Sequence, residues 1–90
     1  MEKFVDDDDG FLRWITQHQG LFVLNTHRSP RADNLRLHRA DCRLFAGIPP
    51  NGKHWTATYV KFCGSRDELE RWALGTVGGD VWPCSVCLVN

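Results

Sequence analysis

His38-Arg39-Ala40-Asp41-Cys42 and, further along the chain, Pro83-Cys84-Ser85-Val86-Cys87 hold four potential metal ligands in two closely spaced pairs. The first pair has the spacing H-x3-C, which brings two donor atoms one turn apart if the chain coils after the histidine. The second has the spacing C-x2-C, which is typical of turns in which two sulfurs bind one ion. Because Zn²⁺ prefers four nitrogen and sulfur ligands in a tetrahedron, the joint pattern predicts a zinc site formed by His38, Cys42, Cys84 and Cys87.

Cys63 is a fifth candidate ligand. It ends an apolar segment just before a predicted helix, a place from which its sulfur could reach a metal, so an all-cysteine site with Cys63 in place of His38 is the alternative. Cys63 could equally be a buried free thiol that packs as a small hydrophobic residue, and without a metal all four cysteines would be buried thiols. His18, His27 and His54 have no ligand-like partner nearby in the sequence, and we expect them at the surface.

The size of the chain makes a structural metal valuable. Ninety residues, 42% of them hydrophobic, suffice for one small domain. A core of this size supplies little net stability, so a metal would provide a large share of it. No apolar run approaches the roughly 18 residues of a membrane span, and the first residues lack the basic and apolar regions of a signal peptide. We therefore expect a cytoplasmic protein with no membrane partner, in which the cysteines are thiols or metal ligands and not disulfides.

Apolar periodicity and turn residues predict one α+β domain over residues 10–90, after an acidic start over residues 1–9 that can fray. The pattern predicts a helix over 10–17, strands over 21–24 and 35–38 that pair as a hairpin, and a third strand over 55–62. Ser65 and Glu68 have capping-box spacing at the start of a second helix, which ends at Gly78-Gly79. The expected architecture is a zinc-stabilised three-stranded antiparallel sheet with two helices and a C-terminal C-x2-C turn; another turn is expected over 47–53.

Three segments together resemble the small Ada-type metal-binding modules: Leu37-His38-Arg39-Ala40-Asp41-Cys42-Arg43-Leu44, Cys63-Gly64-Ser65-Arg66-Asp67-Glu68-Leu69 and Trp82-Pro83-Cys84-Ser85-Val86-Cys87. In those modules an H-x3-C or C-x3-C start, an S-x2-E/A helix and a P-C-x2-C end recur, and the modules are attached to DNA repair proteins and nucleases. The resemblance implies a zinc-held α/β module that works on or near DNA, in repair or restriction. The Ada repair module itself uses four cysteines, one of which accepts a methyl group from a DNA phosphate, whereas the first ligand position here is His38.

The charge distribution points to nucleic acid as a partner. The formal net charge is zero, but residues 1–9 sum to −4 and residues 25–63 sum to +5. Arginine binds phosphates through two parallel hydrogen bonds, and Trp55, Tyr59 or Trp82 could stack on a base if exposed. The competing interpretation is a solvated basic face above buried aromatics. We expect the main contacts, with DNA more than RNA, to come from Arg28, Arg31, Arg36, Arg39 and Arg43.

Two other functions compete with nucleic-acid binding. One is a protein-interaction or regulatory zinc module that uses the acidic N-terminal segment and a tryptophan-containing surface. The other is a repair domain with a thiolate that accepts a methyl group. Four nitrogen and sulfur ligands leave no open position for a catalytic water, and neither H-E-x2-H nor the complete zinc-deaminase pattern is present. We therefore expect a structural zinc in a chain that is not an enzyme by itself.

Overall fold

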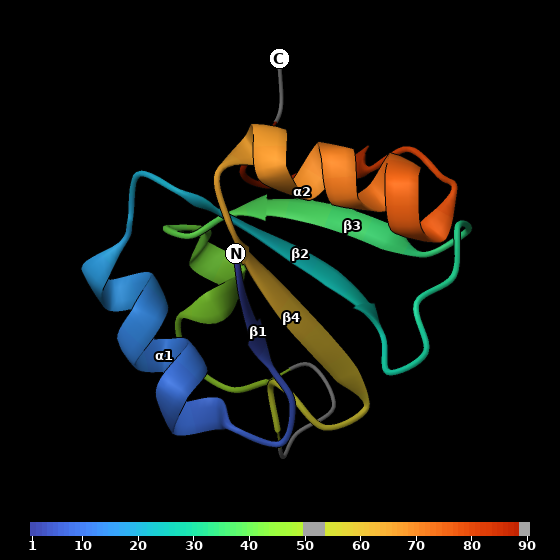
Figure 1. Cartoon of the computed structure of the whole chain (residues 1–90). Helices are drawn as coiled ribbons and strands as arrows, with labels where there is room; N and C mark the ends of the chain where they lie inside the picture. The colour runs from blue at the N-terminus through green and yellow to red at the C-terminus, as the bar shows by residue number, and fades with distance from the viewer. Residues whose placement is uncertain (50–53, 89–90) are drawn as a thin grey trace.

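In the part of the chain that the structure describes, five strands form one mixed sheet in the order β1-β4-β2-β3-β5 (Figure 1). The computed structural model describes residues 1–49 and 54–88. Its elements are β1 (Glu2–Phe4), α1 (Asp8–Gln17), β2 (Phe22–His27), β3 (Leu35–Arg39), η1 (Arg43–Phe45), β4 (Tyr59–Gly64), α2 (Arg66–Trp72), η2 (Ala73–Val77) and β5 (Trp82–Pro83). The predicted α+β class with two helices is confirmed. The predicted three-stranded antiparallel sheet is incomplete: β2, β3 and β4 do pair antiparallel, but two short edge strands extend the sheet, and β5 runs parallel to β3.

The acidic start over residues 1–9, which the sequence predicts as a segment that can fray, contains β1 and the beginning of α1. Glu2–Phe4 pair with β4, and the backbone N–H of Asp6 donates to the carbonyl of Thr56 at 2.8 Å. Asp7 then caps α1, because its carboxylate accepts a hydrogen bond from the backbone N–H of Gly10 at 2.9 Å. Backbone pairing with β4 therefore orders this segment despite its four consecutive aspartates.

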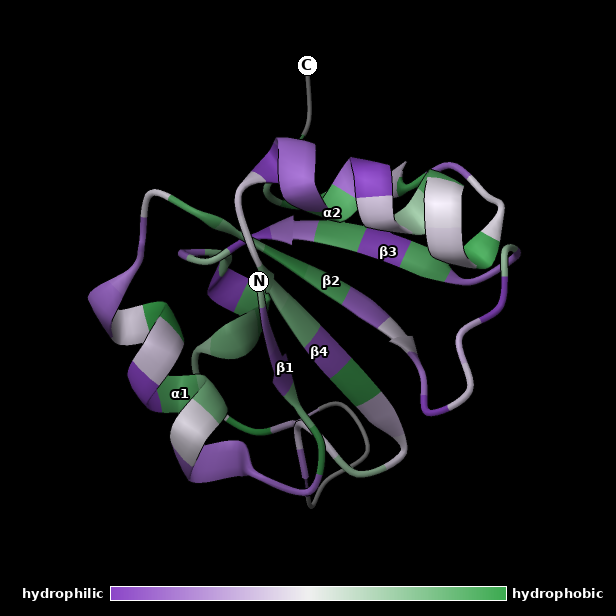
Figure 2. Ribbon diagram, viewed as in Figure 1, coloured by the Kyte–Doolittle hydropathy of each residue, from purple (hydrophilic) through white to green (hydrophobic). Residues whose placement is uncertain are grey.

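The two helices lie on opposite sides of the sheet (Figure 1). On one side, Phe11 and Ile15 of α1 pack with Val23 and Cys63 from the sheet. On the other side, Leu69 of α2 packs with a second set of strand residues, Leu24, Leu37, Val60 and Phe62. Neighbouring strand residues alternate between the two sides because strand side chains have a period of two. This alternation is visible as bands along β2, β3 and β4 (Figure 2).

The second helix begins as the sequence predicts. The backbone N–H of Glu68 donates to Ser65 Oγ at 3.1 Å, and the N–H of Ser65 donates to Glu68 Oε1 at 3.0 Å, which completes the predicted capping box. The helix continues through the wider turn of η2 and ends at Gly78, whose φ of 87° is left-handed. Gly79 follows where a Cβ atom would lie within 3 Å of Ala32, so a side chain would not fit there.

The third predicted strand begins later than expected. β4 starts at Tyr59, and residues 55–58 precede it as irregular chain. The half-buried Asp8 carboxylate explains this shift, because it accepts hydrogen bonds from the backbone N–H groups of Trp55 and Thr56, both at 2.9 Å. Part of the predicted turn over 47–53, namely residues 50–53, and the end of the predicted domain at 89–90 lie outside the described residues. Among the described helices, none is long and apolar enough to cross a membrane.

Candidate metal centre and the adjoining cavity

The structure brings the four predicted ligands together. One donor atom from each of His38, Cys42, Cys84 and Cys87 lies within 4.8 Å of all the others; we call this group the metal centre. For a tetrahedral zinc with Zn–S bonds of about 2.3 Å, two sulfurs would be about 3.8 Å apart. The four residues can therefore close around one metal ion with small side-chain movements.

A tight turn after β3 positions the first pair. His38 lies on β3, on the side of the sheet that carries α1, and its ring contacts Phe45 with a centroid distance of 5.1 Å. The backbone N–H of Cys42 donates to the carbonyl of Arg39 at 3.0 Å, and η1 begins directly after Cys42. The turn therefore folds the thiol of Cys42 back toward the imidazole of His38, as the H-x3-C spacing predicts.

The second pair reaches the same place through β5. The N–H of Cys84 donates to the carbonyl of Leu37 at 2.8 Å, which fixes the C-x2-C turn beside β3. Two further backbone N–H groups donate to sulfur: that of Arg39 to Cys87 Sγ at 3.2 Å and that of Val86 to Cys84 Sγ at 3.4 Å. Hydrogen bonds from N–H groups stabilise the thiolate form, which is the form that binds a metal.

The imidazole of His38 fits a metal ligand. Its Nδ1 is buried and has no hydrogen-bond partner among the described residues. Burial, together with the charges of Lys61 and Arg36, lowers the pKa of His38 to about 4, so the ring is neutral at pH 7. A buried polar atom without a partner is costly, and a metal bond would satisfy it.

The thiols also fit a metal, because without a cation they cannot all ionise in one buried place. Burial raises the pKa of the Cys42 thiol to about 12. Burial acts in the same direction on Cys84, but backbone N–H groups of Cys87 and Val86 outweigh it and hold the pKa of Cys84 below its ordinary value. A divalent ion would supply the positive charge that three neighbouring thiolates need.

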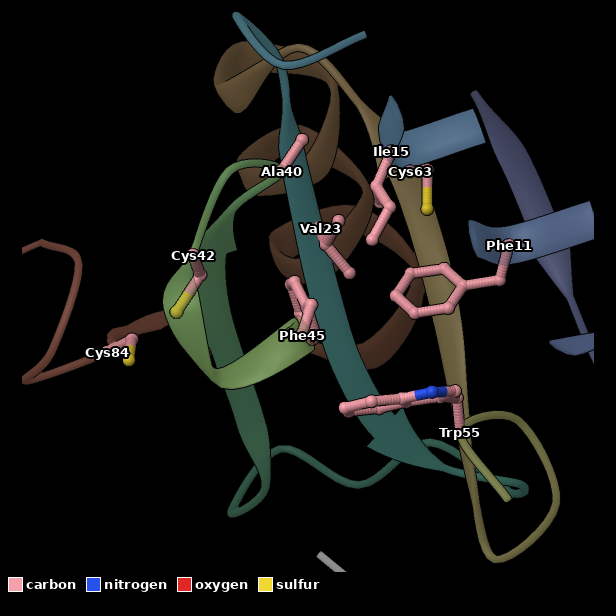
Figure 3. Packing of buried hydrophobic residues seen from close by; sticks show 9 residues of the cluster. All are labelled: Phe11, Ile15, Val23, Ala40, Cys42, Phe45, Trp55, Cys63 and Cys84. Carbon is pink, nitrogen blue, oxygen red and sulfur yellow. The ribbon is translucent and has the colours of Figure 1, made fainter. Parts of the chain in front are cut away.

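Cys63 lies outside the metal centre. It is fully buried on β4 beside Ile15, well away from Cys42 and Cys84 (Figure 3). Burial raises the pKa of its thiol to about 12, so it remains protonated. The alternative ligand set with Cys63 in place of His38 is therefore not the one that the structure assembles. The other histidines have protein neighbours instead: His18 bonds the carbonyl of Trp14, and His27 bonds Asn34.

A cavity of about 420 Å³ adjoins the metal centre and shares His38 with it. Its walls are largely aromatic, from Phe45, Trp55 and Tyr59, and its polar groups include Asn25 and Lys61. Trp55 is buried, and its ring meets that of Phe45 edge to face at 5.8 Å (Figure 3). A mostly apolar cavity with a few polar groups is the usual form of a small-molecule site.

Lys61 is the functional candidate that the sequence did not reveal. Its side chain is only 4% exposed, and its Nζ donates to Asn25 Oδ1 and to the carbonyl of Trp55, each at 2.6 Å. Within residues 1–49 and 54–88 no carboxylate forms an ion pair with it. Burial lowers the pKa of Lys61 to about 8, so the ammonium form still predominates at pH 7. In the sequence Lys61 is one charged residue of the predicted strand over 55–62, and nothing local signals its burial.

Three of the five predicted nucleic-acid contacts pair with carboxylates. The guanidinium of Arg28 bonds Asp6, that of Arg31 bonds Asp33, and that of Arg39 bonds Asp41, all at the surface. Arg36 and Arg43 are exposed, and neither forms an ion pair within the described part of the chain. The basic charge that the sequence concentrates in residues 25–63 is thus partly neutralised on the folded surface.

A row of side chains crosses the sheet on the side of the cavity. Lys61 on β4 is paired with Asn25 on β2, Asn25 with Arg36 on β3, and Arg36 with Trp82 on β5. Directly paired residues share a face of the sheet; we call these four residues the polar row. Hydrophilic bands cross β4, β2 and β3 in Figure 2. Trp82, at the outer end of the row, is 61% exposed.

Comparison of the chain with protein-family models, with curated proteins and with solved structures finds no match in any of the three. The resemblance to Ada-type modules therefore stays a prediction from the sequence motifs, and functional inference depends on the metal centre, the cavity and the polar row.

Proposed function

We propose that this chain is a zinc-stabilised nucleic-acid-binding module, with DNA repair or restriction as the setting that its motifs suggest. The metal in this proposal is Zn²⁺, because three cysteines and one histidine are the donors of structural zinc sites, whereas Mg²⁺ and Ca²⁺ prefer oxygen. The role is structural: four protein ligands leave no position for a reactive water, and the metal links β3 to the turn after β5. The metal itself then has no direct part in binding the nucleic acid.

The observation that carries the nucleic-acid part is the polar row. It places a guanidinium (Arg36) next to an exposed indole (Trp82) on one face of the sheet. Proteins that bind single strands combine cationic groups that track phosphates with aromatic side chains on which bases stack. Among the five arginines expected to contact nucleic acid, Arg36 and Arg43 therefore contribute most to the affinity. Arg28, Arg31 and Arg39 contribute less, because a phosphate must first displace an aspartate from each of them.

Salt-dependent binding tests this proposal. Zinc-loaded protein is titrated into labelled single-stranded and duplex DNA and RNA while fluorescence anisotropy is recorded at several salt concentrations. Each phosphate neutralised should lower the logarithm of the affinity by about 0.7 per tenfold increase in salt for single strands and about 0.9 for duplexes. Arg36→Ala should weaken binding and reduce this slope by about 1 unit for a duplex. Arg71→Ala, on α2 at the opposite side of the sheet, is the matched control and should change neither quantity.

A protein-interaction module is the second candidate function. The exposed indole of Trp82 favours it, because an exposed tryptophan is enriched at protein interfaces. The same titration separates the two functions: no binding to any strand at low salt would exclude the nucleic-acid module and leave the protein-interaction module.

A further inference from the structure

We infer that the cavity beside the metal centre is a pocket for a single unstacked nucleobase, presented by a single strand or extruded from a duplex. This inference rests on the proposed nucleic-acid binding and specifies which part of the ligand the chain reads. A base that enters such a pocket is held by stacking on aromatic walls and by hydrogen bonds to one of its edges. The cavity offers both kinds of contact.

The walls suit a flat aromatic ligand. Phe45 and Trp55 meet edge to face at 5.8 Å, which gives the cavity two aromatic walls at a steep angle to each other, and 77° separates their planes. Tyr59, at 37% exposed, adds a third ring that solvent can reach. The volume of about 420 Å³ lies within the range of about 300–1,000 Å³ that is usual for ligand sites. The space is sufficient for a purine or a pyrimidine.

Two polar groups that line the cavity, Lys61 and Asn25, have hydrogen-bond donors to offer a ligand. An ammonium has three N–H donors, and Lys61 uses two of them on Asn25 and Trp55, which leaves one. Because an ammonium can only donate, the Asn25 atom that faces it is the amide oxygen. The amide NH₂ of Asn25 therefore remains, with no hydrogen bond among the described residues. Lys61 and Asn25 together match a ligand edge with two neighbouring acceptors.

This donor pair predicts which bases are preferred. Guanine presents O6 and N7 side by side, and cytosine presents O2 and N3, whereas the acceptors of thymine and adenine are separated by a donor or lie alone. The ammonium of Lys61, which has no ion pair among the described residues, also attracts an electron-rich edge more than a donor-rich one. The pocket should therefore favour guanine and cytosine over adenine and thymine.

The polar row connects this pocket to the outer surface. Asn25 lines the cavity, and its neighbour in the row is Arg36, followed by Trp82 at the sheet edge. A strand that follows the row would place a phosphate at Arg36 and stack an adjacent base on Trp82, while one base enters the cavity. The surface contacts and the pocket thus belong to one continuous path.

Short labelled strands with one altered position test the inference. The zinc-loaded chain is titrated with thymidine strands, DNA and RNA, that carry at the centre guanine, cytosine, adenine or no base. We expect the central guanine or cytosine to bind roughly tenfold more tightly than the abasic strand, because stacking and edge contacts of one base are lost. The strand with a central adenine should have an affinity between those of these two kinds of strand. Equal affinity for abasic and base-containing strands would overturn the pocket while leaving the proposed function intact, and no binding to any strand would overturn both.

Two variants and a matched control test whether residues of the cavity produce the base preference. Lys61→Met should remove the preference for guanine and cytosine, and Tyr59→Ala should weaken all base-containing strands toward the abasic level. Lys3→Met on β1 changes an exposed lysine and should alter neither. Zinc content and circular dichroism establish that each variant is folded; if Lys61→Met does not fold, the exposed Tyr59→Ala decides alone. An unchanged preference for guanine and cytosine in the folded variants would overturn the inference. Competition by benzoate but not by nucleosides would also overturn it, and would indicate a pocket for a small aromatic acid.

Discussion

The backbone N–H of Arg39 donates to Cys87 Sγ at 3.2 Å, so the residue that follows one predicted ligand on β3 directly contacts the last cysteine of the C-x2-C turn. The turn is held to β3 a second time by the N–H of Cys84 on the carbonyl of Leu37. The two halves of the metal centre are therefore joined by backbone hydrogen bonds as well as by their shared position. A metal there would join segments that are far apart in the sequence.

Removing the metal should destabilise the whole chain. Because the ligands come from β3, from the turn after it and from the turn after β5, the binding free energy of the metal is part of the folding free energy. Treatment with a strong chelator should lower the free energy of unfolding by several kcal/mol, measured by urea denaturation. Readdition of zinc should restore it. Identical denaturation curves with and without metal would contradict this prediction.

Ligand substitutions should separate His38 from Cys63. His38→Ala should lower zinc affinity strongly, because it removes one of four ligands, whereas His38→Cys should retain zinc by completing an all-cysteine site. Cys63→Ser should keep one zinc per chain, since the side chain of Cys63 lies outside the metal centre. Competition with a zinc-sensitive dye measures all three affinities. Zinc loss in Cys63→Ser, with retention in His38→Ala, would reverse the ligand assignment.

Because Lys61 is buried, the free energy of unfolding should change with pH in the alkaline range. Burial depresses the pKa of Lys61 from 10.5 to about 8, so between these values the unfolded chain binds a proton that the folded chain has released. The free energy of unfolding should therefore rise with pH across this window, by at most about 1.4 kcal/mol per pH unit. The measured quantity is the difference between the wild type and Lys61→Met, which cancels the titration of other groups. A flat difference from pH 8 to 10.5 would show that Lys61 is not buried as described.

The capping box should contribute to stability independently of the metal. Ser65→Ala removes the hydroxyl that accepts the N–H of Glu68 and should cost about 1 kcal/mol. Ser29→Ala, in the exposed loop between β2 and β3, is the matched control and should stay close to the wild type. Urea midpoints of zinc-loaded proteins measure both, and an equal effect of the two substitutions would argue against the cap.

Methylated DNA should leave the chain unmodified. Cys42, Cys63 and Cys84 are buried, so a bulky phosphate triester cannot approach their sulfurs. Cys87 is only partly buried and is the most accessible of the four, but in the proposed zinc site its thiolate would be bound to the metal. Incubation with DNA that carries methylated phosphates, followed by intact-protein mass spectrometry, should show no gain of a methyl group. A stoichiometric gain on any cysteine would contradict the expectation that the chain is not an enzyme by itself, and would support the methyl-acceptor function.

Local signals in the sequence predicted much of the fold. Short-range spacing was enough to predict the H-x3-C and C-x2-C pairs, the helix over 10–17 and the Ser65–Glu68 capping box, because each of these features depends on residues within one or two turns of one another. The edge strands were missed because their pairing depends on distant partners: Glu2–Phe4 form a strand only against β4, and Trp82–Pro83 only against β3. Two or three residues carry too little periodicity to predict a strand alone.

The cavity could not be predicted for the same reason. Its lining comes from β2, β3, η1, β4 and the chain before β4, and the sequence does not say that these segments meet. Lys61 and Asn25 are ordinary strand residues until the sheet pairs them. The charge count likewise overstated the basic surface, because the pairing of Arg28 with Asp6 joins residues that lie in separate parts of the sequence.

X-ray absorption at the zinc edge of the purified chain reports the identity and distance of the atoms bound to the metal, so it measures the ligand set itself. We expect one zinc per chain with three sulfurs at about 2.3 Å and one nitrogen at about 2.0 Å. A spectrum with four sulfurs, a spectrum dominated by oxygen ligands, or protein purified without chelators that contains much less than one zinc per chain would contradict this expectation.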